Sequence, residues 1–128
     1  MPKILFDSDV IIEYLRKNEK VVDAIEALML SDSTLAIAPV TEAEIRRGLR
    51  SHERQKTEKT LSAFECLVTD RRVGKQAGDY LRTYTRSHGL EIPDALVAAT
   101  GFVYNFSLCT FNWKHYPMQD LQQYRMER

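Results

Sequence analysis

Apolar residues recur along the chain at two spacings, one typical of strands and one typical of helices. A short apolar run at residues 3–6 is followed by two segments, residues 10–15 and 21–29, in which apolar side chains return at helical spacing. This pattern predicts a strand and then two helices. The run at residues 35–38, closed by Pro39, predicts the second strand.

The alternation continues through the middle of the chain. We expect a helix to begin at Thr41 and a longer polar helix to follow it, before another short apolar run at residues 66–68. That run predicts a third strand. The apolar stripe at residues 73–84 then predicts a helix that ends near Gly89, because glycine commonly ends helices.

The last part of the chain predicts one more helix, one more strand and a closing helix. Pro93 is suited to a first helical position, and the helix it opens should run to about Tyr104. Residues 106–109 are expected to form the last strand, and a closing helix is expected from Pro117 onward. Because strands and helices alternate, the sequence predicts an α/β fold: one domain over residues 1–128, with a central, mostly parallel, twisted sheet of four to five strands flanked by helices on both faces.

Composition narrows this picture only slightly. The 128 residues are enough for one domain with its own core, and 18 basic residues balance 18 acidic ones. Any anion binding must therefore come from local clusters of charge. The start of the chain resembles neither a signal peptide nor a membrane span, so we expect a cytoplasmic protein without a membrane contact. Cys66 and Cys109 lack the spacing of metal ligands and are expected to be free, buried thiols.

Acidic residues follow the predicted strands. Asp7 and Asp9 come after the first strand, Glu42 and Glu44 after the second, and Asp94 lies at the start of the helix that precedes the last strand. In open α/β sheets the functional crevice lies beyond the carboxyl ends of the strands. We therefore expect these oxygen ligands to gather at one edge of the sheet, together with Asn112 after the last strand.

Each of these residues also has a structural explanation that stays open. Asp7 and Asp9 can cap the next helix, Thr41 and Glu44 have the spacing of a capping box, and Asp94 suits the positive end of a helix. Asn112 can be an ordinary turn residue. Capping alone, however, does not require several acids to converge on one edge of a sheet.

Several carboxylates in one crevice repel one another unless a cation holds them together. Mg²⁺ or Mn²⁺ is the ion that such a set is expected to bind, because hard divalent ions take oxygen ligands and need only a few carboxylates. Sites of this kind act on phosphates by activating a water and neutralising the leaving oxygen. The three histidines, His52, His88 and His115, show no ligand or triad spacing and are expected to be surface or packing residues.

Four segments resemble the successive motifs of the PIN-domain family, and more narrowly the VapC-type toxins of toxin–antitoxin pairs. They are Asp7-Ser8-Asp9-Val10-Ile11-Ile12, Thr41-Glu42-Ala43-Glu44-Ile45-Arg46-Arg47-Gly48, Pro93-Asp94-Ala95-Leu96-Val97-Ala98-Ala99-Thr100 and Thr110-Phe111-Asn112-Trp113-Lys114-His115-Tyr116-Pro117. No single motif is specific, but four in order are strong evidence. The family's fourth acidic position is occupied here by Asn112.

The resemblance implies a metal-dependent endoribonuclease that hydrolyses RNA phosphodiester bonds, with tRNA among the candidate substrates. It assigns Asp7, Glu44 and Asp94 to a Mg²⁺ or Mn²⁺ ion, and Asn112 to the catalytic set. Asp9 and Thr110 are assigned supporting roles. It also implies inhibition by a cognate VapB-like antitoxin, and a homodimer.

One basic stretch is a candidate for RNA binding. Arg46, Arg50 and Arg54 follow one another at intervals of four and would share one face if the helix continues. The alternative is a solvated helix face on which these arginines pair with Glu42, Glu53 and Glu58.

Two other functions remain open from the sequence. Residues 4–10 resemble the opening segment of haloacid-dehalogenase-type phosphatases, in which the first aspartate, here Asp7, is the nucleophile. Such an enzyme would need a later paired acidic motif, and only Asp120 follows Lys114. The second alternative is a PIN-like binding module that does not cleave and acts only through partners.

Overall fold

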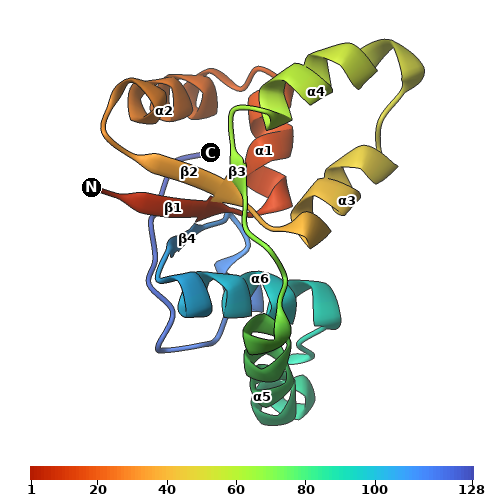
Figure 1. The fold of residues 1–128 in the computed structure, drawn as a ribbon, viewed down its shortest axis with the longest axis vertical. Helices are drawn as coiled ribbons and strands as arrows, with labels where there is room; N and C mark the ends of the chain where they lie inside the picture. Colours follow the sequence, from red (N-terminus) through yellow and green to blue (C-terminus); the bar gives the residue numbers. More distant parts are fainter.

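The computed structural model describes residues 1–128 and contains one sheet with helices on both sides (Figure 1). The strands are β1 (Lys3–Phe6), β2 (Thr34–Ile37), β3 (Glu65–Cys66) and β4 (Ser107–Cys109). The α-helices are α1 (Ser8–Leu15), α2 (Glu19–Leu30), α3 (Pro39–Arg47), α4 (Arg54–Leu61), α5 (Arg71–His88) and α6 (Ile92–Tyr104). Two short 3-10 helices, η1 (Ser51–Glu53) and η2 (Trp113–His115), complete the chain. No helix has the length and apolar character that a membrane span requires.

All four strands are parallel, and their order across the sheet is β3-β2-β1-β4. β1 is central, with Leu5 opposite Ala36 of β2 on one side and Leu108 of β4 on the other. The carboxyl ends of β1, β2 and β4 therefore lie along one edge of the sheet. This confirms the predicted α/β fold with a parallel sheet and helices on both faces.

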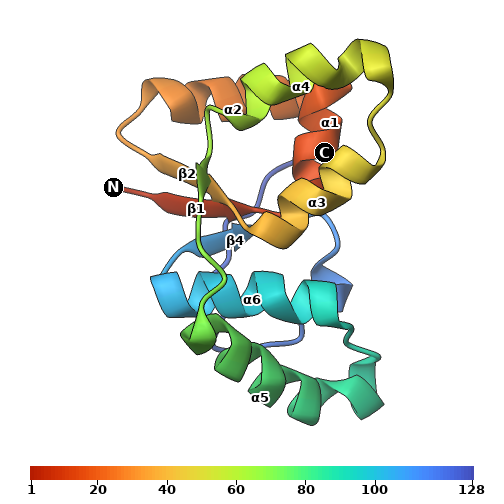
Figure 2. The ribbon, with the colours of Figure 1, turned by 45° about the vertical axis from the view of Figure 1, so that its right-hand side comes forward.

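The two faces of the sheet carry separate hydrophobic cores, because successive strand residues point to opposite sides. On β1, Ile4 and Phe6 pack against α1–α4, whereas Leu5 packs against α5 and α6. All three side chains are fully buried. Phe6 also makes an edge-to-face contact with Phe64, with ring centroids 5.6 Å apart. Figures 1 and 2 show α1–α4 on one side of the sheet and α5 and α6 on the other.

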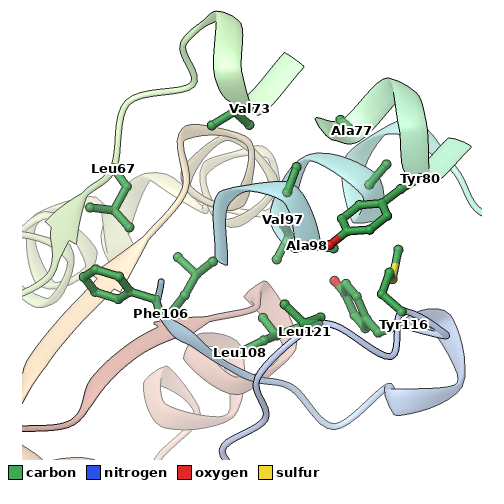
Figure 3. Packing of buried hydrophobic residues seen from close by; sticks show 14 of the residues in the cluster. Leu67, Val73, Ala77, Tyr80, Val97, Ala98, Phe106, Leu108, Tyr116 and Leu121 are labelled. Atoms are coloured by element: carbon green, nitrogen blue, oxygen red, sulfur yellow. The ribbon is translucent and has the colours of Figure 1, made fainter. Parts of the chain in front are cut away.

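The core under α5 and α6 also includes the C-terminal segment (Figure 3). Val73, Ala77 and Tyr80 of α5 face α6, and Leu121 of the C-terminal segment packs from the sheet side. Gly101 of α6 permits this approach, since a Cβ there would lie 3.2 Å from Leu121 Cδ1.

Two helix ends are as the sequence predicted. Gly89 after α5 and Asn105 after α6 both adopt the left-handed conformation, with φ of 64° and 60°. Pro93 lies in the first turn of α6, as expected.

The closing helix predicted from Pro117 is wrong. This segment contains no helix: after a turn at residues 119–120 it forms a parallel bridge between Gln123 and Leu108 of β4. Leu108 N–H donates to the Gln122 carbonyl at 2.9 Å, and Tyr124 N–H donates to the Leu108 carbonyl at 2.8 Å. The free edge of β4 therefore supplies backbone partners that favour an extended chain over a helix.

Three smaller predictions are also corrected. α3 begins at Pro39, with Ala38 as its N-cap, so Thr41 and Glu44 do not form a capping box. The third strand covers only Glu65–Cys66. Neither cysteine forms a disulfide, but Cys66 is exposed because it lies on an edge strand, and only Cys109 is buried.

Candidate active site

Asp7 occupies the turn between β1 and α1 and has two structural roles at once. It is the N-cap of α1, and its Oδ1 accepts a hydrogen bond from Ser8 N–H at 2.9 Å. The capping explanation is therefore correct for Asp7. The side chain is nevertheless buried, and its Oδ2 accepts hydrogen bonds from Thr110 Oγ1 at 2.9 Å and from Tyr116 OH at 2.8 Å. A cap needs none of these additional donors.

Asp9 links α1 to the segment that follows β4. Its Oδ2 accepts a hydrogen bond from Phe111 N–H at 3.0 Å, and Thr110 Oγ1 lies 3.4 Å from both of its carboxylate oxygens. Thr110 thus contacts Asp7 and Asp9 together. The two aspartates of the first motif and the threonine of the fourth meet at the same edge of the sheet.

Asp94, in the first turn of α6, is connected to Asp7 through one buried hydroxyl. Tyr116 OH lies 2.8 Å from Asp7 Oδ2 and 3.2 Å from Asp94 Oδ1. The other Asp94 oxygen, Oδ2, lies 3.5 Å from Nδ1 of His115. These contacts bring β1, α6 and η2 together around one polar cluster.

Glu44 approaches the cluster from α3, which packs against both α1 and α6. It is partly buried, and burial raises its pKa most, with the charges of Asp7 and Asp94 acting in the same direction. Glu42 instead points toward Arg46, whose Nε donates to Glu42 Oε2 at 2.9 Å. Of the two glutamates after β2, Glu44 is therefore the one that faces the aspartates.

The electrostatics of the cluster centre on Asp7. Burial is the largest cause that raises the pKa of Asp9, Glu44 and Asp94, and repulsion from Asp7 is the second cause for each of them. Burial also raises the pKa of the Tyr116 hydroxyl, with the charges of Asp7 and Asp94 acting in the same direction. Tyr116 therefore stays protonated and donates to these carboxylates.

The donor set fits a hard divalent cation. Every charged ligand atom in the cluster is a carboxylate oxygen, and the carboxylates destabilise one another in the absence of a positive charge. In this arrangement no three acidic, histidine or cysteine side chains are close enough together to enclose an ion. The acids therefore share one edge of the sheet without forming a closed cation cage in this structure.

Asn112 lies at the rim of the cluster. Its side chain is exposed and makes no hydrogen bond within the chain, while its N–H donates to Thr110 Oγ1 at 3.1 Å. Sequence reasoning missed Tyr116 and assigned no role to His115, although both belong to the fourth motif. His115 is on the surface, as expected, but it faces Asp94. The sequence signal that could have identified Tyr116 is a tyrosine within the short polar segment that follows the last strand.

The three candidate arginines do not lie on one helix, because α3 ends at Arg47 and α4 begins at Arg54. They still line one shallow surface hollow of about 390 Å³. Arg46 forms ion pairs with Glu42 and Glu58, so the alternative of a solvated, paired face is correct for this residue. Arg50 and Arg54 have no acidic partner within ion-pair distance.

Comparison with known proteins identifies the family. A model of the PIN domain family matches residues 4–120. Ribonuclease VapC10 of Mycobacterium tuberculosis is 39% identical over 118 residues, which cover 90% of this chain and 86% of that protein.

Solved structures of similar shape agree with this match. The structure of VapBC2 from Rickettsia felis bound to a promoter DNA fragment contains a chain with a TM-score of 0.83 and 21% identity, covering 98% of this chain and 99% of the other. A chain of FitAcB from Neisseria gonorrhoeae gives a TM-score of 0.73 at 27% identity, with 97% and 96% covered. The chain described here belongs to the PIN domain family and, within it, to the VapC group.

Proposed function

We propose that the protein is an endoribonuclease that hydrolyses RNA phosphodiester bonds with the help of Mg²⁺ or Mn²⁺. One observation carries this proposal: carboxylates from the β1–α1 turn, α3 and α6 share one partly buried cluster, in which Tyr116 OH links Asp7 to Asp94, and burial and then repulsion from Asp7 raise the pKa of Asp9, Glu44 and Asp94. Such repulsion is costly for a fold unless a cation offsets it.

In this proposal Asp7, Glu44 and Asp94 would hold the ion. A divalent cation bound there would supply an activated water and neutralise charge on the leaving oxygen. Thr110 and Tyr116 orient Asp7 by donating to its Oδ2, and Asp9 fixes the segment after β4 through Phe111 N–H. Asn112, exposed at the rim, is positioned to contact the substrate or a water at the site.

Relatives support the choice of RNA and of a partner. The 39% identical protein from M. tuberculosis is named a ribonuclease, and the matched region covers most of both chains. Similar chains have been solved within toxin–antitoxin complexes, including one from Klebsiella pneumoniae. We therefore assign to this chain a VapB-like antitoxin as its inhibitor, a homodimeric state, a cytoplasmic location and an RNA substrate, with tRNA as one candidate.

The phosphatase alternative has no support in the geometry. A nucleophilic aspartate must reach its substrate, whereas Asp7 is 6% exposed and its Oδ2 accepts hydrogen bonds from two side chains. These contacts favour a carboxylate that is held in place over one that attacks.

The test is cleavage of total RNA by the purified protein, with Mg²⁺ or Mn²⁺ and then with chelator. We expect discrete cuts only with metal, and a loss of activity of at least a hundredfold, about 3 kcal/mol of transition-state free energy, in Asp94→Asn. Asp79→Asn, at an exposed position of α5, is the matched control and should cut like wild type.

Two results would count against the proposal. Cleavage that persists in chelator would exclude the metal-dependent mechanism. A folded wild-type protein that binds RNA and metal but cuts nothing would favour the non-cleaving binding module.

A further inference from the structure

A second hollow lies directly beside the acidic cluster and has a different chemistry. It has a volume of about 420 Å³ and shares Thr110 with the cluster. Its other lining residues come from the segment after β4 and from the C-terminal end of the chain; they are Phe111, Trp113, Arg125, Met126, Glu127 and Arg128.

The hollow combines aromatic rings with arginines. The guanidinium carbon of Arg125 lies 4.6 Å from the centroid of the Trp113 ring, and that of Arg128 lies 5.5 Å from the centroid of Phe111. Both rings are partly exposed. Flat aromatic and guanidinium faces are the surfaces on which unpaired RNA bases stack.

Of the charged side chains that line the hollow, only Arg125 lacks an oppositely charged partner. Glu127 Oε2 lies 3.6 Å from Lys20 Nζ, and Arg128 donates to Glu13 at 3.1 Å. Arg125 has no acidic partner; its Nε donates only to the neutral Gln123 at 3.1 Å. Arg125 is therefore available to a phosphate.

The fold holds this arrangement next to the acids. Phe111 N–H donates to Asp9, so the backbone that carries the two rings is fixed to the cluster. The C-terminal segment is fixed to β4 through Gln122 and Tyr124, which places Arg125 over the ring of Trp113. Trp113 lies three residues after Thr110 and three before Tyr116, the two residues whose hydroxyls donate to Asp7.

We propose that this hollow is a base-binding subsite, in which one unpaired RNA base next to the cleaved phosphate extends the stack that Arg125 forms on Trp113, while Arg125 contacts the flanking phosphate. The subsite rests on the proposed ribonuclease function and adds to it the side chains that would contact a base beside the acids. Trp113 is the chain's only tryptophan, so tryptophan fluorescence reports on the surroundings of this one side chain.

The experiment separates binding from cleavage by using Asp94→Asn in chelator. An octamer of adenylate RNA is titrated while Trp113 fluorescence is recorded, and the anisotropy of the same labelled RNA is measured in parallel. We expect quenching that saturates together with the anisotropy. An octamer in which every base is removed should bind about tenfold more weakly, because stacking is lost, and should not quench.

Arg125→Gln tests the phosphate contact in the same background. It should weaken RNA binding and lower the slope of log Kd against log salt by about 0.7, the contribution of one contact to a single strand. Arg86→Gln, an exposed arginine on α5 that forms no ion pair, is the control and should change neither value.

Three results would overturn the inference. The first is RNA binding without a change in Trp113 fluorescence, and the second is equal quenching by the abasic strand. The third is quenching by an octaglutamate peptide but not by RNA, which would make the hollow a protein-docking site. Wild-type cleavage with metal separates the two proposals. If wild type cuts RNA but Trp113 does not respond, only the subsite is wrong; if Trp113 responds but wild type cuts nothing, only the nuclease is wrong.

Discussion

Asp7 shows why single residues in this chain were ambiguous from the sequence. It caps α1 as an ordinary aspartate does, and after burial its charge is also the second cause that raises the pKa of Asp9, Glu44 and Asp94. The sequence could predict that these acids share an edge of the sheet, because each follows or precedes a strand. It could not predict Tyr116 as the link between Asp7 and Asp94, because the path of the chain after β4 decides where that hydroxyl lies.

Removing one charge from the cluster should stabilise the metal-free protein. In Asp94→Asn the side chain can still accept the hydrogen bond from Tyr116, but its repulsion with Asp7 is gone. We expect Tm at neutral pH in chelator to rise by about 4 °C, which corresponds to about 1 kcal/mol in a domain of this size. Differential scanning calorimetry measures this, and a lower Tm would show that the acids do not destabilise one another.

Tyr116 should position the metal ligands without contacting the metal. Tyr116→Phe removes the hydroxyl shared by Asp7 and Asp94 and keeps the buried ring, so we expect Mn²⁺ affinity to fall about tenfold. Calorimetric titration gives the affinity. Tyr80→Phe is the matched control, since Tyr80 also donates to an aspartate, Asp120, at 3.0 Å but lies outside the site. Equal losses in both variants would indicate a general effect on packing.

At the scale of elements, the sequence predicted the strands and most helices because their apolar periods are clear. The errors fall where tertiary contacts decide the structure. The segment after Pro117 lacks a strong strand pattern, and its residues 122–124 pair with the open edge of β4. In α3, Pro39 sets the first turn, and Thr41 is drawn into the core instead of capping the helix.

Substitution of Thr41 by an apolar residue of similar shape should stabilise the folded protein. Its side chain is fully buried, and Oγ1 has no hydrogen-bond partner. Thr41→Val replaces this hydroxyl with a methyl group of similar shape, so we expect the free energy of unfolding to rise by about 1 kcal/mol. Urea denaturation measures the change, and Thr57→Val, at another buried threonine of a helix, provides a comparison. A destabilised Thr41→Val would mean that the hydroxyl has a partner in solution.

For the whole molecule, the acidic cluster should make stability depend on pH and on metal. The pKa values of Asp9, Glu44 and Asp94 are raised in the folded state, above the unfolded values of about 3.9 for Asp and 4.3 for Glu. The folded state then binds more protons than the unfolded state between the two values. The contribution of these groups is therefore favourable below the unfolded pKa values and is lost as pH rises through the folded ones.

We expect the difference in Tm between wild type and Asp94→Asn to shrink as pH falls from 7 toward 4.5. Saturating Mn²⁺ should reverse its sign at pH 7, because the ion stabilises only the protein that binds it. Thermal melts across this pH range, with Mn²⁺ and with chelator, measure both effects. A difference that is independent of pH and metal would contradict the electrostatic account of the cluster.

The central claim is that these acids converge in order to hold a divalent cation. Isothermal titration of Mn²⁺ into the protein without RNA tests this most directly, with wild type, Asp94→Asn and the exposed control Asp79→Asn compared at pH 7. We predict saturable binding by wild type and Asp79→Asn, and at least tenfold weaker binding by Asp94→Asn. Equal affinity in all three proteins, or no binding by wild type, would contradict the claim.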